Sequence, residues 1–444
     1  MSSRYLELSP SNKTTDNLYS FKKGVAQITF DIPAGNYLLD PDSVRISGSV
    51  RLYKDSAGTV PAANHSEYLN LDSRLGIWSV MQQVIWRSSK FQTTLEHNRH
   101  YNRWLSSYLP VTAGQDDTLG HLSQSALVLP NYELEKRSVV DIGEDNHFCV
   151  HMPCGLLRGG NAINLMENAL GGLSLTIMLE SDSQVLNVDP ADATTPPVIA
   201  TYADAMYELK DVKLLCSVIT PPPDQLSQLM KQTTGSLNFQ TIHSYYDTAN
   251  SMNIQSAMNF GLSKVKSMFV NIIASQNLNN FAEKSFATLM PMNSDGTVAN
   301  VKNMSWLKGG TTYPRLYPVD TNYYDTPTTS MVDPVVIRDF LNAIASWDVN
   351  KSLTANSANT TRCITGKADN IGTPYYFVID GGPIYGWGVN FENYLGGSGI
   401  NLTRDNFGFA VDCDLLTNNA QSLFYFVNAE SNVVWNQNGV QVLQ

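Results

Sequence analysis

The sequence predicts an all-β protein made of two consecutive β-sandwich domains, each carrying one short inserted helix. Three observations support this fold class. Charged residues make up only 16% of the 444 residues and 43% are apolar, a composition suited to strands joined by turns. Many segments alternate apolar and polar side chains with a period of two. Two short amphipathic helices, at 98–108 and 333–344, occupy the same place among these segments.

The first half reads as a series of strands. Residues 25–32 alternate almost without fault and stop at Pro33. Residues 43–53 alternate again, with a one-residue slip near Gly48 that we interpret as a β-bulge. Further strands are expected at 80–87, 91–95, 146–152, 173–179 and 208–219.

Both helices show apolar side chains on one face. In the first, Tyr101, Trp104, Leu105 and Tyr108 share a face. The second is expected to begin with Asp333 as its cap and Pro334 in its first turn, and its apolar positions are 336, 337, 340, 341 and 344.

Three successive prolines, Pro221 to Pro223, separate the two halves because they remove three backbone donors from any β-ladder. Asp224 is expected to cap a short helix after them. The predicted division is an N-terminal arm at 1–19, a first roll at 20–220, a linker helix at 221–235 and a second roll at 236–444. Strands of the second half are expected at 238–246, 256–274 with a break near 263, 303–308, 375–379, 399–402, 407–415, 422–427 and in a final hairpin at 433–443.

Each half has the size of a β-sandwich with long loops, and its helix lies where a jelly roll would accommodate an insertion between strands, so we expect two consecutive eight-stranded jelly-roll sandwiches, each with an inserted helix. The two rolls are joined by the Pro-rich linker and its short helix. The duplication is inferred from element order, because residue identity between the halves is too weak to see by eye.

Charge and hydropathy argue against several classes of protein. The net charge is −11 and the sequence pI is about 5.1, so the chain should repel nucleic-acid phosphates, and we expect no sequence-specific nucleic-acid binding. No apolar segment follows Met1, so we expect no secretory signal. The apolar stretch 162–179 is interrupted by Asn164 and Glu167, so we expect no transmembrane segment. Five cysteines, an odd number, suggest reduced thiols in a protein made inside a cell.

One strand offers a possible metal site. His147, Cys149 and His151 point to the same face of the expected strand, and Cys154 follows Pro153 as a fourth potential zinc ligand. Ligands at every second residue of one strand suit a tetrahedral ion poorly. The favoured interpretation is that these side chains pack on a strand face, so we expect no metal and no cofactor.

Other chemistry-bearing residues have simpler structural explanations. His97 and His100 flank the first helix without a zinc-protease pattern, and Ser398 lacks the spacing of a nucleophile elbow. Asp412 and Asp414 share a strand face and could bind calcium or cleave glycans, but edge or interface carboxylates are commoner. We therefore expect no enzymatic activity.

An aromatic, proline-rich stretch is the candidate subunit interface, because tyrosine and arginine are favoured at interface centres. Its candidate residues are Tyr313, Arg315, Tyr317, Tyr323 and Tyr324.

The sequence resembles the double jelly-roll major capsid proteins of icosahedral DNA viruses, a family that includes polinton- and adintovirus-like elements, virophages, large algal viruses and adenovirus hexon. Three passages carry the resemblance. They are residues 28–33 with 39–46, residues 78–109, and residues 207–221 with the helix at 224–231.

The resemblance implies a homotrimer whose six rolls form a pseudo-hexagonal tile of a virion shell, with neighbouring capsomers, penton and minor capsid proteins as partners. The alternatives are a two-domain β-sandwich that binds or cleaves glycans, and a minor capsid component.

Overall fold

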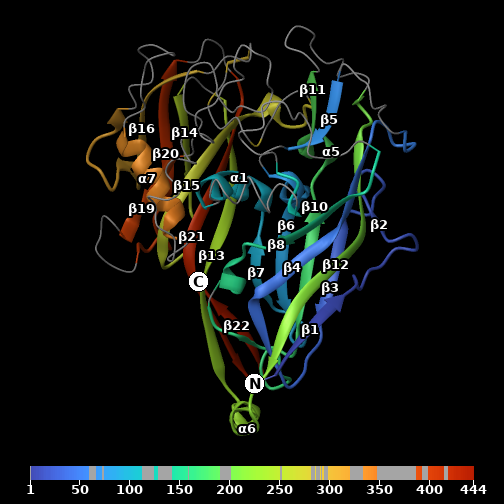
Figure 1. Ribbon diagram of the computed structural model, residues 1–444. Coiled ribbons are helices and arrows are strands. Elements are labelled where there is room, and N and C mark those ends of the chain that lie inside the picture. Colours follow the sequence, from blue (N-terminus) through green and yellow to red (C-terminus); the bar gives the residue numbers. More distant parts are fainter. Residues whose placement is uncertain are drawn as a thin grey trace.

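The structure is a computed structural model that describes most of the chain. The residues that it does not describe are 1, 60–66, 73–74, 113–124, 129–142, 159, 191–201, 251–252, 282–285, 287–290, 292, 295–298, 321–333, 348–386, 393–398 and 415–418. Two β-sandwiches stand side by side, with helices between them and a short helix below (Figure 1).

The described part of the first half contains two main antiparallel sheets, each built on four main strands, and a two-stranded sheet of β5 (Glu67–Leu71) and β11 (Leu186–Pro190). In spatial order, sheet I consists of β1 (Ser2–Leu8), β12 (Met206–Thr220), β4 (Leu38–Tyr53) and β8 (Asn146–His151). Sheet II consists of β3 (Gln27–Ile32), β10 (Leu173–Leu179), β6 (Met81–Ser88) and β7 (Thr94–Asn98).

The second half repeats this arrangement. In the same spatial order, sheet III consists of β13 (Gly235–Ala249), β21 (Gln421–Asn436), β15 (Val265–Ala274) and β19 (Trp387–Asn390). Sheet IV consists of β14 (Asn253–Met258), β20 (Phe407–Asp414), β16 (Asn300–Lys308) and β17 (Thr311–Thr312).

The remaining elements are short strands and helices around these main strands. The strands are β2 (Leu18–Tyr19), β5 (Glu67–Leu71), β9 (Ile163–Asn164), β11 (Leu186–Pro190), β18 (Val319–Asp320) and β22 (Gly439–Leu443). The helices are α1 (Tyr101–Thr112), α4 (Gly155–Arg158), α5 (Asp182–Val185), α6 (Pro223–Lys231) and α7 (Pro334–Ala345), with 3₁₀ turns η1 (Gly76–Val80) and η3 (Ser275–Asn277).

The two halves have the same strand topology. When the eight main strands of each half are numbered in chain order, sheets I and III both run 1-8-3-6, and sheets II and IV both run 2-7-4-5. In both halves a helix, α1 or α7, lies between the fifth and sixth strands. This confirms the predicted fold of two eight-stranded jelly rolls with inserted helices, and it gives the duplication a strand-by-strand correspondence that the sequence did not provide.

The structure corrects several local expectations. Ser2–Leu8, which the sequence placed in an arm outside the first roll, form β1 and pair with β12 from Ser2↔Thr220 to Leu8↔Leu214. The apparent long strand at 256–274 is two strands in different sheets, so its break near 263 is a crossing from sheet IV to sheet III. Helix α6 begins after Pro222, and Asp224 lies in its first turn without capping it.

The bulge that the sequence suggested on β4, near Gly48, lies on the paired strand β12. The pairing of β4 with β12 slips between Lys210 and Lys213, opposite Gly48, and Asp211 adopts a positive φ of 51° there. A Cβ at Gly48 would lie 3.0 Å from the Lys210 carbonyl oxygen, so the glycine accommodates the bulged neighbour. The expected strand at 399–402 is reduced to a single bridge between Ile400 and Val265, and 375–379 lies outside the described residues.

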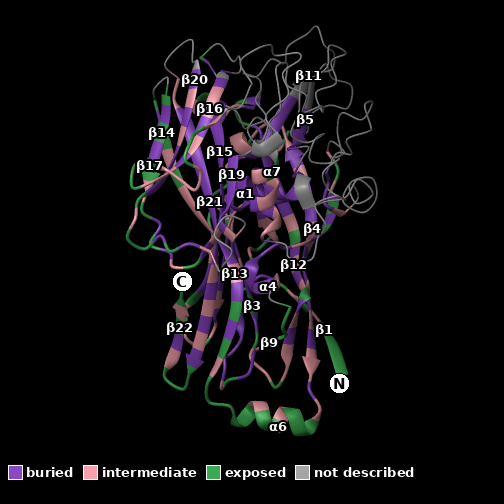
Figure 2. Cartoon of the chain, turned by 90° about the vertical axis from the view of Figure 1, so that its left-hand side faces the viewer, coloured by how far each residue is buried: buried purple, intermediate pink, exposed green. Residues whose placement is uncertain are grey.

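The core of each roll lies between its two sheets, where buried side chains alternate with exposed ones along the strands (Figure 2). In the second roll, for example, Trp387 of sheet III meets Phe409 of sheet IV with ring centroids 5.3 Å apart. Helix α6 has no buried residue and lies at the base of the molecule (Figure 2). Among the described helices, none combines the length and apolar character needed to cross a membrane.

Candidate functional site

The two rolls meet along the inserted helices, helix α4 and their neighbouring strands. We call this contact the seam: β7, α1 and α4 of the first roll meet β13, β15, β21 and α7 of the second. Helices α1 and α7 contact each other, and Figure 2 shows them side by side near the middle of the molecule. The two elements that the sequence singled out as landmarks of duplication therefore join the rolls.

An aromatic cluster forms the centre of the seam. Trp104 of α1 packs edge-on against Trp347, just beyond α7, with ring centroids 4.4 Å apart. Tyr108 stacks on Trp104 at 4.8 Å and meets Trp347 edge-on at 5.0 Å. The Arg158 guanidinium lies 4.5 Å from the Trp347 ring centroid. Such a cluster combines large apolar burial with favourable ring geometry, so it should hold the rolls in one orientation.

Polar groups fix α1 on sheet III. Ser107 Oγ donates to Asn271 Oδ1 at 2.9 Å, and Asn271 Nδ2 donates to the Arg103 carbonyl at 3.3 Å. The Arg103 side chain is 1% exposed, and its guanidinium lies 3.9 Å from the Phe286 ring centroid. It also donates to Gln184 Oε1 at 2.7 Å. This buried cation therefore contacts residues of both rolls.

Glu96 is a buried carboxylate at the same contact. One of its oxygens, Oε1, accepts from Gly155 N at 2.8 Å, Thr241 Oγ1 at 2.9 Å and Asn98 Nδ2 at 3.1 Å. The other, Oε2, accepts from Leu156 N at 2.8 Å. Burial raises the pKa of Glu96, and its four donors oppose that effect. Because Thr241 belongs to β13, this carboxylate links the start of α4 to the second roll.

Gly155 marks the closest backbone approach in the seam. A Cβ at this position would lie 1.8 Å from the Gln240 carbonyl oxygen and 3.0 Å from Glu96 Oε1. Only glycine therefore allows α4 to sit against β13 in this way.

Substitution of Gly155 by alanine should destabilise the protein by about 1–3 kcal/mol, because the opposing atom is backbone and the strand must shift. Gly439→Ala is the matched control, since a Cβ there meets nothing within 4 Å. Denaturant unfolding of the two variants measures the difference. Equal midpoints would show that α4 and β13 do not approach each other this closely.

His100 places an imidazole between the rolls. Its ring centroid lies 5.0 Å from that of Phe424 and 6.2 Å from that of Tyr246, both in sheet III. Burial, followed by the charges of Arg103 and Arg99, lowers the pKa of His100 to about 4. The folded protein therefore holds this histidine neutral.

A pH dependence follows from this depressed pKa. Between pH 6.5 and about 4 the unfolded chain binds a proton at residue 100 that the folded chain does not, so stability should fall as the pH falls through that window. His100→Asn should flatten this part of the stability curve while tolerating the positive φ of 49°. Unfolding midpoints measured from pH 7 to pH 4 give the slopes. Parallel curves for wild type and variant would exclude His100 as a source of acid sensitivity.

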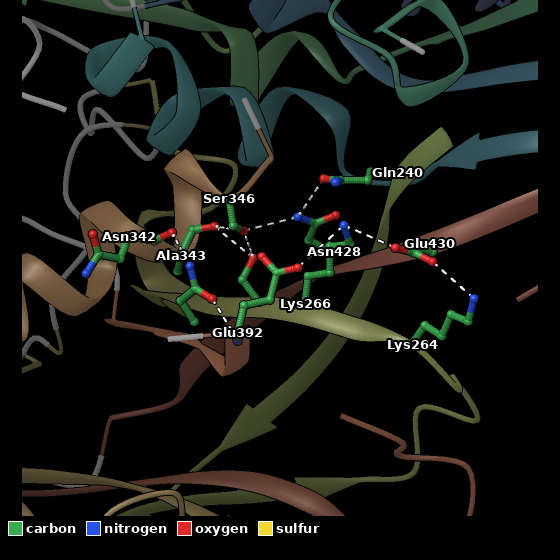
Figure 3. A network of polar contacts seen from close by, with 11 residues as sticks. Gln240, Lys264, Lys266, Asn342, Ala343, Ser346, Glu392, Asn428 and Glu430 are labelled. Atoms are coloured by element: carbon green, nitrogen blue, oxygen red, sulfur yellow. Dashed lines mark hydrogen bonds and ion pairs between the residues drawn. The ribbon is translucent and has the colours of Figure 1, made fainter. Parts of the chain in front are cut away.

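A polar network beneath α7 extends the seam (Figure 3). Ser346 Oγ donates to Ser267 Oγ at 2.6 Å and accepts from Asn428 Nδ2 at 3.2 Å. Lys266 lies 3.1 Å from Glu430 and 3.5 Å from Glu392, and is only 14% exposed. These contacts fix the end of α7, and with it Trp347, on the outer face of sheet III.

A cavity of about 850 Å³ opens below this network between the rolls. It is lined by Asp42 and Arg158 of the first roll and by Lys264, Lys266 and Glu430 of the second. Opposite charges are mixed along its wall, so it shows no selective field for an anion or a cation.

Three of the four potential metal ligands share one face of β8, and Cys154 lies beyond the end of that strand. His147 and Cys149 are exposed and His151 is half-buried on the outer face of β8, as the alternation predicts. Cys154 is buried near Tyr101 and Glu96, where burial raises the pKa of its thiol. Within the described residues no three His, Cys, Asp or Glu side chains are grouped for a metal.

The predicted interface stretch divides into anchors and a tip. Tyr313 packs near Phe391 and Phe407, at centroid distances of 6.5 and 6.4 Å, and Arg315 forms an ion pair with Asp339 at 2.7 Å. Tyr317 projects into solvent and is 77% exposed. Tyr323 and Tyr324 lie outside the described residues.

The other residues considered for catalysis or metal binding are His97, Asp412, Asp414 and Ser398, and two of them have partners on neighbouring strands. His97 Nε2 lies 2.9 Å from Gln83 Oε1, and burial lowers the pKa of His97 to about 4. Asp412 Oδ2 accepts from Asn303 Nδ2 at 3.3 Å on the neighbouring strand. Ser398 and the side chain of Asp414 lie outside the part of the chain that the structure describes.

Sequence reasoning missed the residues that join the rolls. Glu96 resembled any strand carboxylate, Gly155 any turn glycine, and Trp347 lay beyond the expected end of the second helix. The polar sequence around Glu96, with Thr94, His97 and Asn98, gave no sign that its carboxylate is buried. Leu316, which is 82% exposed, was also overlooked between the aromatic candidates.

Solved structures with the same architecture are found by comparison with known proteins. No protein-family model matches the sequence, and no curated protein matches it significantly. Solved structures do match along the whole chain. The PBCV-1 virus capsid aligns with 10% identity and a TM-score of 0.56, covering 100% of this chain and 96% of the matched one.

Two named capsid proteins give similar results. The Faustovirus major capsid protein aligns with 10% identity and a TM-score of 0.54, covering 98% of this chain and 90% of its own. The mavirus major capsid protein aligns with 10% identity and a TM-score of 0.51, covering 100% and 92%. These neighbours are double jelly-roll capsid proteins, so the comparison confirms the fold that the resemblance implied.

Proposed function

We propose that this chain is a major capsid protein that assembles as a homotrimer and tiles an icosahedral shell around a DNA genome. The observation that carries the proposal is the repeated 1-8-3-6 and 2-7-4-5 topology, in a fold shared over the full chain with capsid proteins of PBCV-1, Faustovirus and mavirus.

The seam supports a structural role on physical grounds. Aromatic stacking, a buried arginine and a buried carboxylate hold the rolls as one rigid building block. Because the angle between the rolls is fixed, a contact on one roll also fixes the orientation in which the other roll meets its neighbour. The mechanism is then self-assembly through shape and surface burial, and the net charge of −11 helps to keep the free subunit soluble.

The proposed location is the capsid of the virion. Its partners would be further copies of the chain, first within the trimer and then in adjoining capsomers, with penton and minor capsid proteins completing the shell. No catalytic step and no cofactor enters this function.

The mass of the purified protein tests the proposal. Light scattering after size-exclusion chromatography should give a stable species near three times 49.0 kDa. A monomer at every concentration would contradict the trimer. A monomer that hydrolyses or binds glycans would support the two-domain glycan protein instead.

A further inference from the structure

Sheet III of the second roll and sheet I of the first roll are equivalent, but only the outer face of sheet III is known to be covered by the seam. This difference points to a further contact surface. On the outer face of sheet III, register pairs align Tyr246, Phe424 and Asn271 in one row, and Ser244, Phe426 and Phe269 in the next. Helix α1 packs against the first row and α7 against the second, through the contacts of Asn271 and Phe269 with Ser107 and Phe340. This face is therefore covered by the seam.

Sheet I is the topological equivalent of sheet III, but several of the described side chains on its outer face are exposed or partly exposed, whereas Ser49 is buried. Register pairs align Lys210, Ser49 and His147 in one row, and Lys213, Ser47 and Cys149 in the next. His147 and Cys149 are exposed, and Lys210 and Lys213 are partly exposed. We call this surface the sheet I face. It is polar, as expected for a surface that meets water before assembly.

The segment of the first roll that packs on sheet III also has an equivalent in the second roll, and within the described residues that equivalent takes no part in the seam. In the first roll, the residues that directly follow the fifth strand, β7, enter the seam: Ser244 donates to the Arg99 carbonyl, and His100 meets Phe424. In the second roll, the residues that directly follow the fifth strand, β17, are 313–317. Their tip, Leu316 and Tyr317, is 82% and 77% exposed.

The tip is presented on a fixed base. Tyr313 N donates to the Trp306 carbonyl at 2.9 Å, and the ion pair between Arg315 and Asp339 ties the loop to α7. Two large side chains are thus held in solvent by an anchored loop, an arrangement that costs solvation free energy unless something covers it. The sheet I face and the tip belong to opposite flanks, as the labels β2 and β16 show (Figure 1).

We propose that the seam is repeated between subunits: the Leu316–Tyr317 tip of one copy docks on the sheet I face of the next copy. The occupant of that face is therefore a second copy of this chain. The contact is heterologous, since different surfaces meet, and a heterologous contact closes into a ring when its rotation permits. Three copies then form a ring of six rolls in which contacts within and between chains alternate. The number three rests on the proposed function, whereas the pairing of surfaces rests on the internal repeat.

Cysteine cross-linking tests the pairing. The probe variant carries Tyr317→Cys and Lys210→Cys in a Cys149→Ser background, and a short bis-maleimide is added to the folded protein. The two introduced thiols lie on opposite flanks of one chain, so a cross-link must join two chains. Covalent dimers and trimers are expected on a denaturing gel.

A matched control replaces Lys210→Cys by Met230→Cys in the same background. Met230 is 52% exposed on α6 at the base, away from the proposed contact. It should give only the weak ladder seen with Tyr317→Cys alone. All three variants carry Tyr317→Cys, so any weakening of the trimer by that change is common to them and does not affect the comparison.

The results separate the two proposals. A trimer in which the probe variant cross-links no better than the Met230→Cys control would overturn the pairing of surfaces and leave the capsid proposal standing. A wild-type protein that stays monomeric at every concentration would overturn both. As a second measurement, Tyr317→Ala should weaken trimer association by roughly tenfold or more, whereas Leu443→Ala, at a residue that is 55% exposed, should not.

Discussion

Replacement of Trp104 by alanine should lower the free energy of unfolding by about 3–5 kcal/mol, among the largest effects of a single substitution in this protein. The indole is only 2% exposed and contacts Tyr101, Tyr108 and Trp347. Its removal leaves a cavity between α1 and the end of α7, where neither roll can collapse without moving relative to the other. Guanidinium unfolding followed by circular dichroism measures the loss.

The control for this prediction is Leu443→Ala, which removes an exposed side chain and should change stability by no more than about 0.5 kcal/mol. Should Trp104→Ala cost less than about 1 kcal/mol, the aromatic cluster would not be what joins the rolls. The same experiment on Trp347→Ala should give an effect of similar size. The double variant should cost less than the sum, because the two rings contact each other.

Glu96→Ala is expected to be the second most damaging change, with a loss of roughly 3–5 kcal/mol. The substitution leaves the backbone N–H groups of Gly155 and Leu156 and the Thr241 hydroxyl without their acceptor in a buried site. Each such donor costs about 1–3 kcal/mol when left unsatisfied. Denaturant unfolding at neutral pH is the measurement.

Glu96→Gln separates hydrogen bonding from packing, because it keeps the shape and one acceptor oxygen. It should cost less than the alanine variant, and still more than a surface change, since its amide nitrogen would oppose another donor. If the glutamine and alanine variants were equally stable to within about 0.5 kcal/mol, the four hydrogen bonds would contribute little. The seam would then depend on its aromatic residues alone.

The sequence supported much of the fold. Period-two alternation predicted strands such as 25–32 and 43–53, and the three prolines marked the end of β12 and the start of α6 at Pro223. Alternation reports burial of one face and not the sheet to which a strand belongs. For that reason residues 256–274 looked like one strand, although β14 and β15 belong to different sandwich layers. Likewise β1 has mostly exposed side chains, so Ser2–Leu8 carried no strand signal and resembled an arm.

The site was less accessible from the sequence, because a contact between domains depends on pairs far apart in the chain. Ser107 and Asn271, or Glu96 and Thr241, carry no local pattern that predicts their meeting. The aromatic stretch was recognisable by composition, yet only the structure separates the anchors Tyr313 and Arg315 from the exposed Tyr317. The strand that suggested a zinc site supplies the edge of the sheet I face, and its exposed side chains need no metal to explain them.

The assignment of this chain as the subunit of a pseudo-hexagonal capsomer is tested most directly by imaging the purified protein. Negative-stain class averages should show threefold particles with a hexagonal outline, in which six roll-sized densities surround a common axis. Averages showing only two-lobed monomers, or dimers related by a twofold axis, would contradict the account.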